Sequence, residues 1–245
     1  MALTPEQEWT IVACGLIAHA DGELTAGECD PVLAAIDERL PADERATWTA
    51  ILTDGDALER RFQQTPPPLP LFHEELLERA WSIALADGDA SEAEHAALVR
   101  IAAHIGVDLE ELAAWRARWD KAAAELAEHK ACFAALLIHA DGTIDPAEVD
   151  GFRAFVERMP VDPTRRVEFL EMLDRAPTLD HIGARIAGLP RERRIEVLRA
   201  IAPLVAASEQ EQVGRAFFLE LAAQAAAPPG LAERLLEGDA PSSAH

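Results

Sequence analysis

The sequence predicts an all-α protein, and three observations support this fold class. Alanine, leucine, arginine and glutamate, which favour helices, dominate the composition. Between the turn signals, apolar residues recur at steps of three and four, which is the spacing of one helix face. β-branched residues nowhere alternate with polar ones for long enough to indicate a strand. We therefore expect amphipathic helices packed in bundles.

Several elements can be placed in chain order. Ile11, Cys14 and Ala18 lie at helical spacing near the N-terminus, and the apolar residues of 76–85 predict a second helix. Glycine and proline are absent between Gly106 and Gly142, so a helix over 109–140, about 50 Å long, is one alternative. A break near 128–130 is the other. Stretches that contain proline separate the remaining helices, at 65–70, 176–177 and 189–190.

A short acidic motif occurs three times between the predicted helices. It reads Ala-Asp-Gly, with an acidic residue seven positions after the aspartate, in HADGELTAGE, LADGDASEAE and HADGTIDPAE. The two acidic residues that define each copy are Asp21 and Glu28, Asp87 and Glu94, and Asp141 and Glu148, and we call them the six motif carboxylates. A fourth, degenerate copy has Ala207 at the aspartate position and keeps Glu211.

The spacing of the motifs predicts an internal duplication. Asp21 and Asp141 are 120 residues apart, and so are the Arg-Ala pairs at 79–80 and 199–200. We expect two tandem domains, 1–121 with two intact motifs and 122–245 with one intact and one degenerate motif.

The motif has a purely structural interpretation. Glycine ends one helix in a left-handed conformation, and Thr25, Ser91 and Asp145 then cap the next helix. The motif glutamates follow three residues later, where a capping box places a glutamate. The aspartates fit this interpretation less well, because a carboxylate in the last turn of a helix faces the negative end of the helix dipole. A turn stabilised by the aspartate is one explanation, and a bound cation is the other.

The cation interpretation rests on the hard oxygen ligands. Asp21 to Glu28 and Asp141 to Glu148 match the second half of an EF-hand loop, whereas the first half is missing. One motif offers too few ligands, but two facing motifs would offer four carboxylates. We expect a divalent cation, calcium in the first instance, at the six motif carboxylates.

These motifs resemble the TerB-like domains of tellurite-resistance proteins. The resemblance rests on the Ala-Asp-Gly pattern appearing twice in about 120 helical residues, and it extends over the whole chain as two tandem copies. It implies a bundle of about seven helices, an acidic surface linked to divalent cations, and a bacterial stress response. The second domain, 122–245, departs from the pattern at Ala207, which puts cation binding there in doubt.

Charge and motif content exclude other classes of function. The chain carries a formal net charge of −22, which opposes binding to nucleic acid or to an anionic membrane and favours a basic protein partner. It contains no GxSxG elbow, no phosphate-binding glycine loop and no HExxH motif, so we expect no enzyme. The three cysteines form no CxxC pair, and the start has no basic region before an apolar stretch. We expect a cytoplasmic protein, and the oligomeric state stays open.

The alternative function is an acidic helical interaction module whose motifs serve only as caps and turns.

Overall fold

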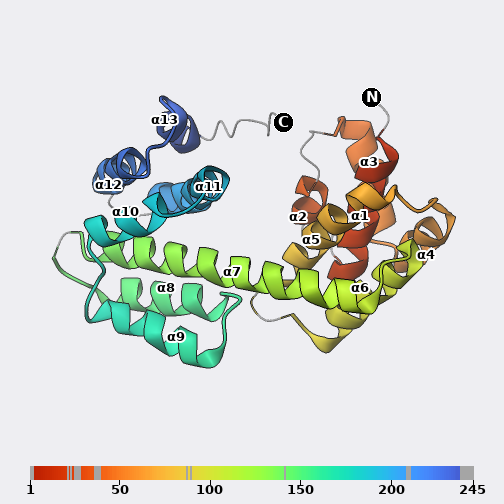
Figure 1. Cartoon of the computed structure of the whole chain (residues 1–245), viewed down its shortest axis with the longest axis horizontal. Helices are drawn as coiled ribbons and strands as arrows, with labels where there is room; N and C mark the ends of the chain where they lie inside the picture. The colour runs from red at the N-terminus through yellow and green to blue at the C-terminus, as the bar shows by residue number, and fades with distance from the viewer. Residues whose placement is uncertain are drawn as a thin grey trace. The chain divides into compact units, whose positions relative to one another are not determined.

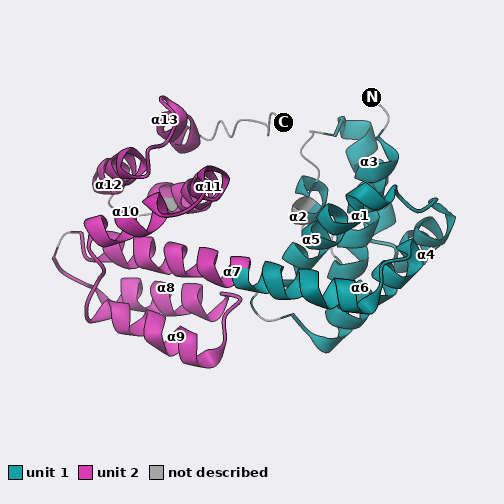
Figure 2. Ribbon diagram, viewed as in Figure 1, with its two compact units in different colours: residues 1–121 teal, residues 122–245 magenta. Residues whose placement is uncertain are grey.

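The computed structural model of the chain describes residues 3–20, 22, 24, 29–35, 40–86, 88, 90–140, 142–207 and 211–237. Every regular element in these ranges is a helix, which confirms the predicted fold class (Figure 1). The chain divides into two compact units, Met1–Lys121 and Ala122–His245 (Figure 2). Within the same ranges, no helix combines the length and the apolar character needed to cross a membrane.

Unit 1 is built around its first helix. Its elements are α1 (Pro5–Ala18), α2 (Cys29–Ala34), α3 (Ala42–Leu52), α4 (Gly55–Gln64), the 3₁₀ helix η1 (Pro70–Phe72), α5 (His73–Ala84), α6 (Glu92–Ile105) and the first part of α7 (Leu109–Ile138). Helix α1 packs against α2, α4, α5 and α6. Every residue from Trp9 to Ile17 is buried, so the amphipathic pattern predicted here is wrong. Neighbouring helices enclose α1, and a helix enclosed in this way is apolar on all sides.

Unit 2 places helices on both sides of the second part of α7. Its further elements are α8 (Pro146–Glu157), α9 (Pro163–Leu170), the 3₁₀ helix η2 (Glu171–Leu173), α10 (Leu179–Ala187), α11 (Arg191–Ala207), α12 (Glu211–Gln224) and α13 (Leu231–Leu236). One core cluster joins α7 to α10, α11, α12 and α13 around Phe133 and Phe218. A second joins α7 to α8 and α9 around Phe152 and Phe169.

Helix α7 decides between the two alternatives that the sequence left open. It runs without a break from Leu109 to Ile138, and the boundary between the two units falls inside it. At its start, the Asp108 carboxylate accepts the backbone N–H of Glu110 at 2.7 Å. This contact satisfies one of the unpaired donors at the helix N-terminus.

A histidine contact at the end of α1 recurs 120 residues later in the chain. In unit 1, the Nε2 atom of His19 lies within hydrogen-bonding distance of the Leu52 carbonyl. In unit 2, the Nε2 atom of His139 lies 3.1 Å from the Met172 carbonyl. Both pairs are separated by the same 33 residues.

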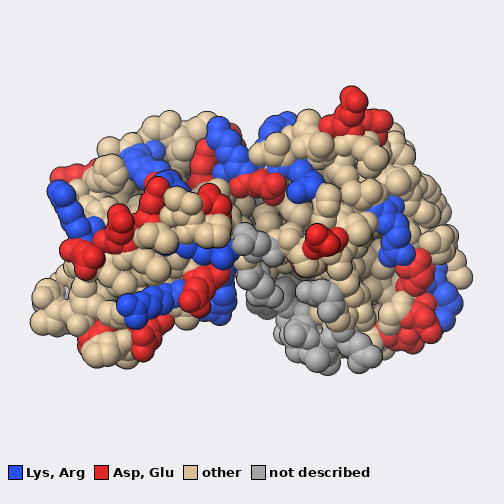
Figure 3. All heavy atoms as spheres, turned by 90° about the horizontal axis from the view of Figure 1, so that it is seen from below, with Lys and Arg blue, Asp and Glu red and all other residues tan. Residues whose placement is uncertain are grey.

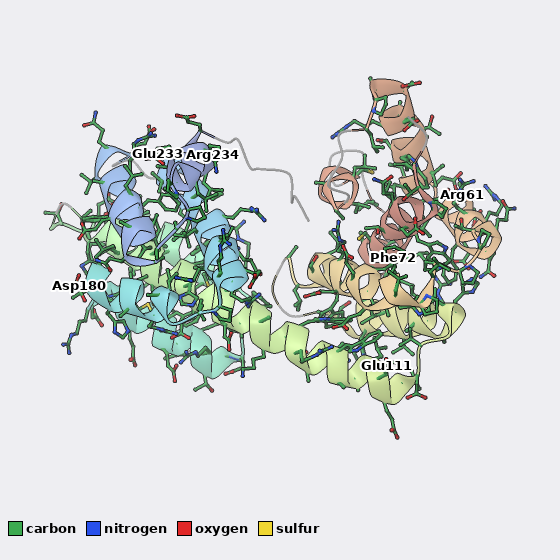
Figure 4. All side chains as sticks on the ribbon, turned by 45° about the horizontal axis from the view of Figure 1, so that its top comes forward. Arg61, Phe72, Glu111, Asp180, Glu233 and Arg234 are labelled. Carbon is green, nitrogen blue, oxygen red and sulfur yellow. The ribbon has the colours of Figure 1, made fainter. Side chains whose placement is uncertain are left out.

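A carboxylate contact recurs with the same offset. In unit 1, the Glu8 carboxylate accepts the Thr65 hydroxyl at 3.0 Å and pairs with Arg61, which Figure 4 labels. In unit 2, the Glu128 carboxylate accepts Arg185 at 2.5 Å. The interacting residues are 57 apart in both units. Two recurring contacts of this kind are what a duplication of about 120 residues predicts.

Candidate functional site

The six motif carboxylates divide into two groups. Asp21, Glu28, Asp87 and Asp141 lie outside the residues that the structure describes, whereas Glu94 and Glu148 lie within them. The aspartate ligands therefore stay a prediction, and the site is built here from the residues that flank them.

Glu94 and Glu148 both act in capping boxes. The Ser91 hydroxyl accepts the Glu94 N–H at 3.2 Å, and Glu94 Oε2 accepts the Ser91 N–H at 2.7 Å. In the third motif, Asp145 Oδ1 accepts the Glu148 N–H at 2.9 Å, and Glu148 Oε2 accepts the Asp145 N–H at 3.0 Å. Pro146 takes the favoured first position of α8. The structural interpretation of these glutamates is thus confirmed, and each keeps its Oε1 atom outside the capping box.

The glycines of the second and third motifs behave as predicted, whereas Gly22 of the first motif lacks the positive φ that was expected. Gly88 follows α5 with a φ of 119°, and Gly142 follows α7 with a φ of 79°. Both values lie where side chains with a Cβ are disfavoured, so glycine lets the chain leave the helix sharply. The second and third motifs are therefore a helix stop followed by a capped helix start, whereas Thr25 and Glu28 of the first motif lie outside the described residues.

A cavity of about 420 Å³ in unit 1 adjoins both of its motifs. Ala20, which immediately precedes Asp21, and Ala93, which immediately precedes Glu94, both line it. The end of α1, the start of α4 and the start of α6 form its walls. The lining residues are Leu16, His19, Ala20, Gly55, Leu58, Glu59, Ala93, Ala96, Ala97 and Arg100.

Polar groups in this cavity are arranged around His19 and Glu59. The Nε2 atom of His19 is engaged by the Leu52 carbonyl, and its Nδ1 atom faces Gly55, where an added Cβ would lie 3.9 Å away. Glu59 accepts Arg100 at 2.9 Å and Gln63 at 3.1 Å. Burial alone would raise the pKa of Glu59, but the hydrogen bonds from Gln63 and Arg100 outweigh it and lower the pKa.

The equivalent place in unit 2 carries larger side chains. At the offset of 120 residues, Val213 stands for Ala93, Phe217 for Ala97 and Gly214, rather than Glu211, for Glu94. Phe217 packs against the core of unit 2. Small residues therefore line the cavity beside the two motifs of unit 1, and unit 2 has a bulky residue at one of the corresponding positions. Aligning the two halves of the sequence could have revealed this difference.

The residues described in the structure contain no group of three or more His, Cys, Asp or Glu side chains that could hold a metal ion. The start of α11 is rich in arginine, with Arg191, Arg193 and Arg194, and two of these side chains form contacts within unit 2. Arg193 pairs with Glu196 at 2.5 Å, and Arg194 donates to the Ala225 carbonyl at 2.8 Å. These contacts favour a structural role for the stretch over a nucleic-acid patch.

Comparison with known proteins finds a similarity over one part of the chain. Residues 7–117 match the family described as tellurite resistance protein TerB. No curated protein and no solved structure matches the chain. A second copy in unit 2 stays a prediction. The TerB match covers nearly the whole of unit 1, so the resemblance seen in the motifs is confirmed for this one copy.

Proposed function

We propose that the chain is a non-enzymatic TerB-like protein of tellurite resistance or a related stress response, and that unit 1 binds a divalent cation. The ligands would be Asp21, Glu28, Asp87 and Glu94, with calcium the first candidate because all are hard oxygen donors. The observation that carries this proposal is the shared cavity, since the residues directly before Asp21 and Glu94 both line it.

The charge distribution supports the same unit. Unit 1 contains 9 basic and 24 acidic residues, and unit 2 contains 13 and 20. A bound cation would offset the excess where it is largest. The Oε1 atom of Glu94 is outside the capping box, so the cap and a role as ligand are compatible.

Unit 2 contains fewer potential cation ligands than unit 1. Asp141 and Glu148 form an intact motif. The second motif of this unit, which would have to face it, is the degenerate copy with Ala207 in place of an aspartate. Phe217 also stands where unit 1 has the small Ala97. We propose that the cation affinity of unit 2 is much lower than that of unit 1.

Calorimetric titration of calcium, followed in parallel by tryptophan fluorescence, tests the proposal. We expect the wild type to bind, and the double substitution Asp21→Asn plus Asp87→Asn to weaken binding by about 100-fold or more, since two of four charged ligands are neutralised. Asp141→Asn is the matched control and should change the affinity by less than about twofold. A wild type that gives no heat with millimolar calcium, magnesium, manganese or zinc would refute the proposal.

The second candidate is an acidic helical interaction module in the cytoplasm, with the motifs serving only as caps and turns. It is favoured by one specific observation: both motif glutamates within the described ranges are used in capping boxes. This candidate predicts that metal-free protein binds its partner as well as protein in calcium does. A pull-down with and without a chelator separates the two functions.

A further inference from the structure

The core of unit 2 is divided where that of unit 1 is continuous. In unit 1, buried residues of α1 to α7 form one cluster. In unit 2, α8 and α11 lie on opposite sides of α7, and their buried residues belong to different clusters (Figure 1). Leu137 of α7 belongs to one cluster and Phe152 of α8 to the other. Met172 packs against both clusters, whereas Leu137 and Phe152 both line a cavity.

A cavity of about 300 Å³ lies at this division. Its walls come from the end of α7, the first half of α8 and one residue of α11. The lining residues are Ala134, Leu137, Ile138, Asp145, Ala147, Glu148, Gly151, Phe152, Phe155 and Leu204. We call this cavity the α8 groove. Its volume is at the lower end for ligand sites, which suits one or two large apolar side chains.

A contact that joins the equivalent helices in unit 1 differs in unit 2. In unit 1, Arg79 of α5 donates from Nη1 to the carbonyl of Ala35, just after α2. At the offset of 120 residues stand Arg199 and Phe155. Arg199 is exposed, and Phe155 is half-buried and lines the groove. The helix pair that a charged hydrogen bond joins in unit 1 is thus separated by an apolar groove in unit 2.

The groove combines apolar walls with negative charge. Its two ionisable lining residues, Asp145 and Glu148, are both carboxylates. Each uses one oxygen in the capping box, which leaves Asp145 Oδ2 and Glu148 Oε1 outside it; we call these two residues the rim of the groove. Acidic and basic side chains are interspersed over the face shown in Figure 3, so a patch of one sign does not mark this surface. An apolar group next to a cation is what the groove itself would recognise.

We infer that the α8 groove binds a basic amphipathic helix of a partner protein. One apolar anchor of that helix would fill the space between Phe152 and Leu204, and a flanking Lys or Arg would pair with Asp145 or Glu148. Helices that dock in grooves between helices use this arrangement of apolar anchors and charged flanks. The net charge of −22 favours the approach of a basic partner. The inference does not rest on the proposed cation site, which lies in unit 1.

A model peptide tests the inference in the full chain. The probe is a fluorescein-labelled peptide of about 18 Leu and Lys residues, with Leu at helical i, i+3, i+4 and i+7 positions. Anisotropy is measured with a chelator present, so that metal binding does not contribute, in about 150 mM salt to screen unspecific attraction. We expect saturable binding, and about tenfold weaker binding of a peptide with the same composition in scrambled order.

Gly151 allows the groove to be filled without disturbing the core. A Cβ added at Gly151 would meet nothing within 4 Å, and the residue is exposed on α8. Gly151→Trp should weaken peptide binding by about tenfold or more, because the indole occupies the groove. Gly151→Ala is the matched control and should bind the peptide as the wild type does.

A second pair of variants tests the charge. Asp145→Asn plus Glu148→Gln removes both rim charges and keeps the capping hydrogen bonds, since Asn and Gln are accepted at these positions. It should weaken binding by about fivefold to tenfold. Asp54→Asn plus Asp162→Asn removes the same charge at the N-caps of α4 and α9, outside the groove lining, and should change binding by less than about twofold.

Three results would overturn the inference. One is equal binding of the ordered and the scrambled peptide, which would show attraction to net charge alone. Another is wild-type affinity in Gly151→Trp. The third is displacement of a small apolar dye by dodecylamine, but not by the peptide, which would assign the groove to a small amphiphilic cation instead.

Discussion

Glu128 joins α7 to two other helices of unit 2. Its carboxylate accepts Arg185 of α10 at 2.5 Å and pairs with Arg165 of α9 at 2.6 Å. The hydrogen bond from Arg185 lowers the pKa of Glu128, and it outweighs burial, which acts in the opposite direction. A carboxylate whose pKa falls on folding stabilises the native state above its unfolded pKa.

We predict that Glu128→Gln lowers the free energy of unfolding by about 1.5 kcal/mol at neutral pH, because the charged part of two hydrogen bonds is lost. The difference in free energy of unfolding between the wild type and the variant is fully present above the unfolded pKa of about 4.3. It disappears as the pH falls through the lower pKa of the folded state. Urea unfolding at neutral and at acidic pH measures the difference.

Glu157→Gln is the control, since Glu157 is exposed at the end of α8. It should leave the free energy of unfolding within about 0.5 kcal/mol of the wild type. If Glu128→Gln lowered the free energy of unfolding equally at acidic and at neutral pH, the pairing of Glu128 with Arg185 and Arg165 would not be the source of the stability.

At the scale of helices, local chemistry made some features predictable. Ser91 with Glu94 and Asp145 with Glu148 form the capping boxes that their spacing predicts. The absence of glycine and proline left both a continuous and a broken α7 possible, because residues of good helix propensity allow either. Long-range contacts decide such cases.

The cavities could not be predicted in the same way. The unit 1 cavity depends on small residues of α4 and α6 that meet α1 in space, such as Gly55 and Ala97. Spacing along one helix does not show which faces meet. The contact of His19 with Leu52 likewise joins residues 33 positions apart, and no local pattern indicates it. The aspartates of the motif stay a prediction from the sequence.

Gly15 gives a test of helix packing around α1. A Cβ added there would lie 2.5 Å from Leu52 Cδ2 and 3.2 Å from Leu58 Cδ2. Leu52 and Leu58 are buried, so they have little space to move. We predict that Gly15→Ala lowers the free energy of unfolding by about 1 to 3 kcal/mol, although alanine favours a helix. Urea unfolding followed by tryptophan fluorescence measures the loss.

Gly151→Ala is the matched substitution in an open place on α8. Nothing lies within 4 Å of the added Cβ, so helix propensity alone should raise the free energy of unfolding by up to about 1 kcal/mol. The two glycines should therefore respond with opposite sign. A stabilising Gly15→Ala would mean that α1 is less tightly enclosed than the structure indicates.

At the scale of the whole molecule, the two units can be observed separately. All five tryptophans, Trp9, Trp48, Trp81, Trp115 and Trp119, lie in unit 1. Tryptophan fluorescence therefore reports the unfolding of unit 1, whereas far-UV circular dichroism reports helix loss in both units. Each unit has its own buried clusters, and only α7 runs through both.

We predict that substitutions in the two units move different signals, because domains with separate cores unfold as separate cooperative units. Glu128→Gln should shift part of the circular dichroism transition to lower urea and leave the fluorescence midpoint unchanged. Gly15→Ala should shift the fluorescence midpoint and the complementary part of the circular dichroism transition. Coincident shifts of both signals in both variants would contradict independence, and would mean that α7 couples the two units into one cooperative transition.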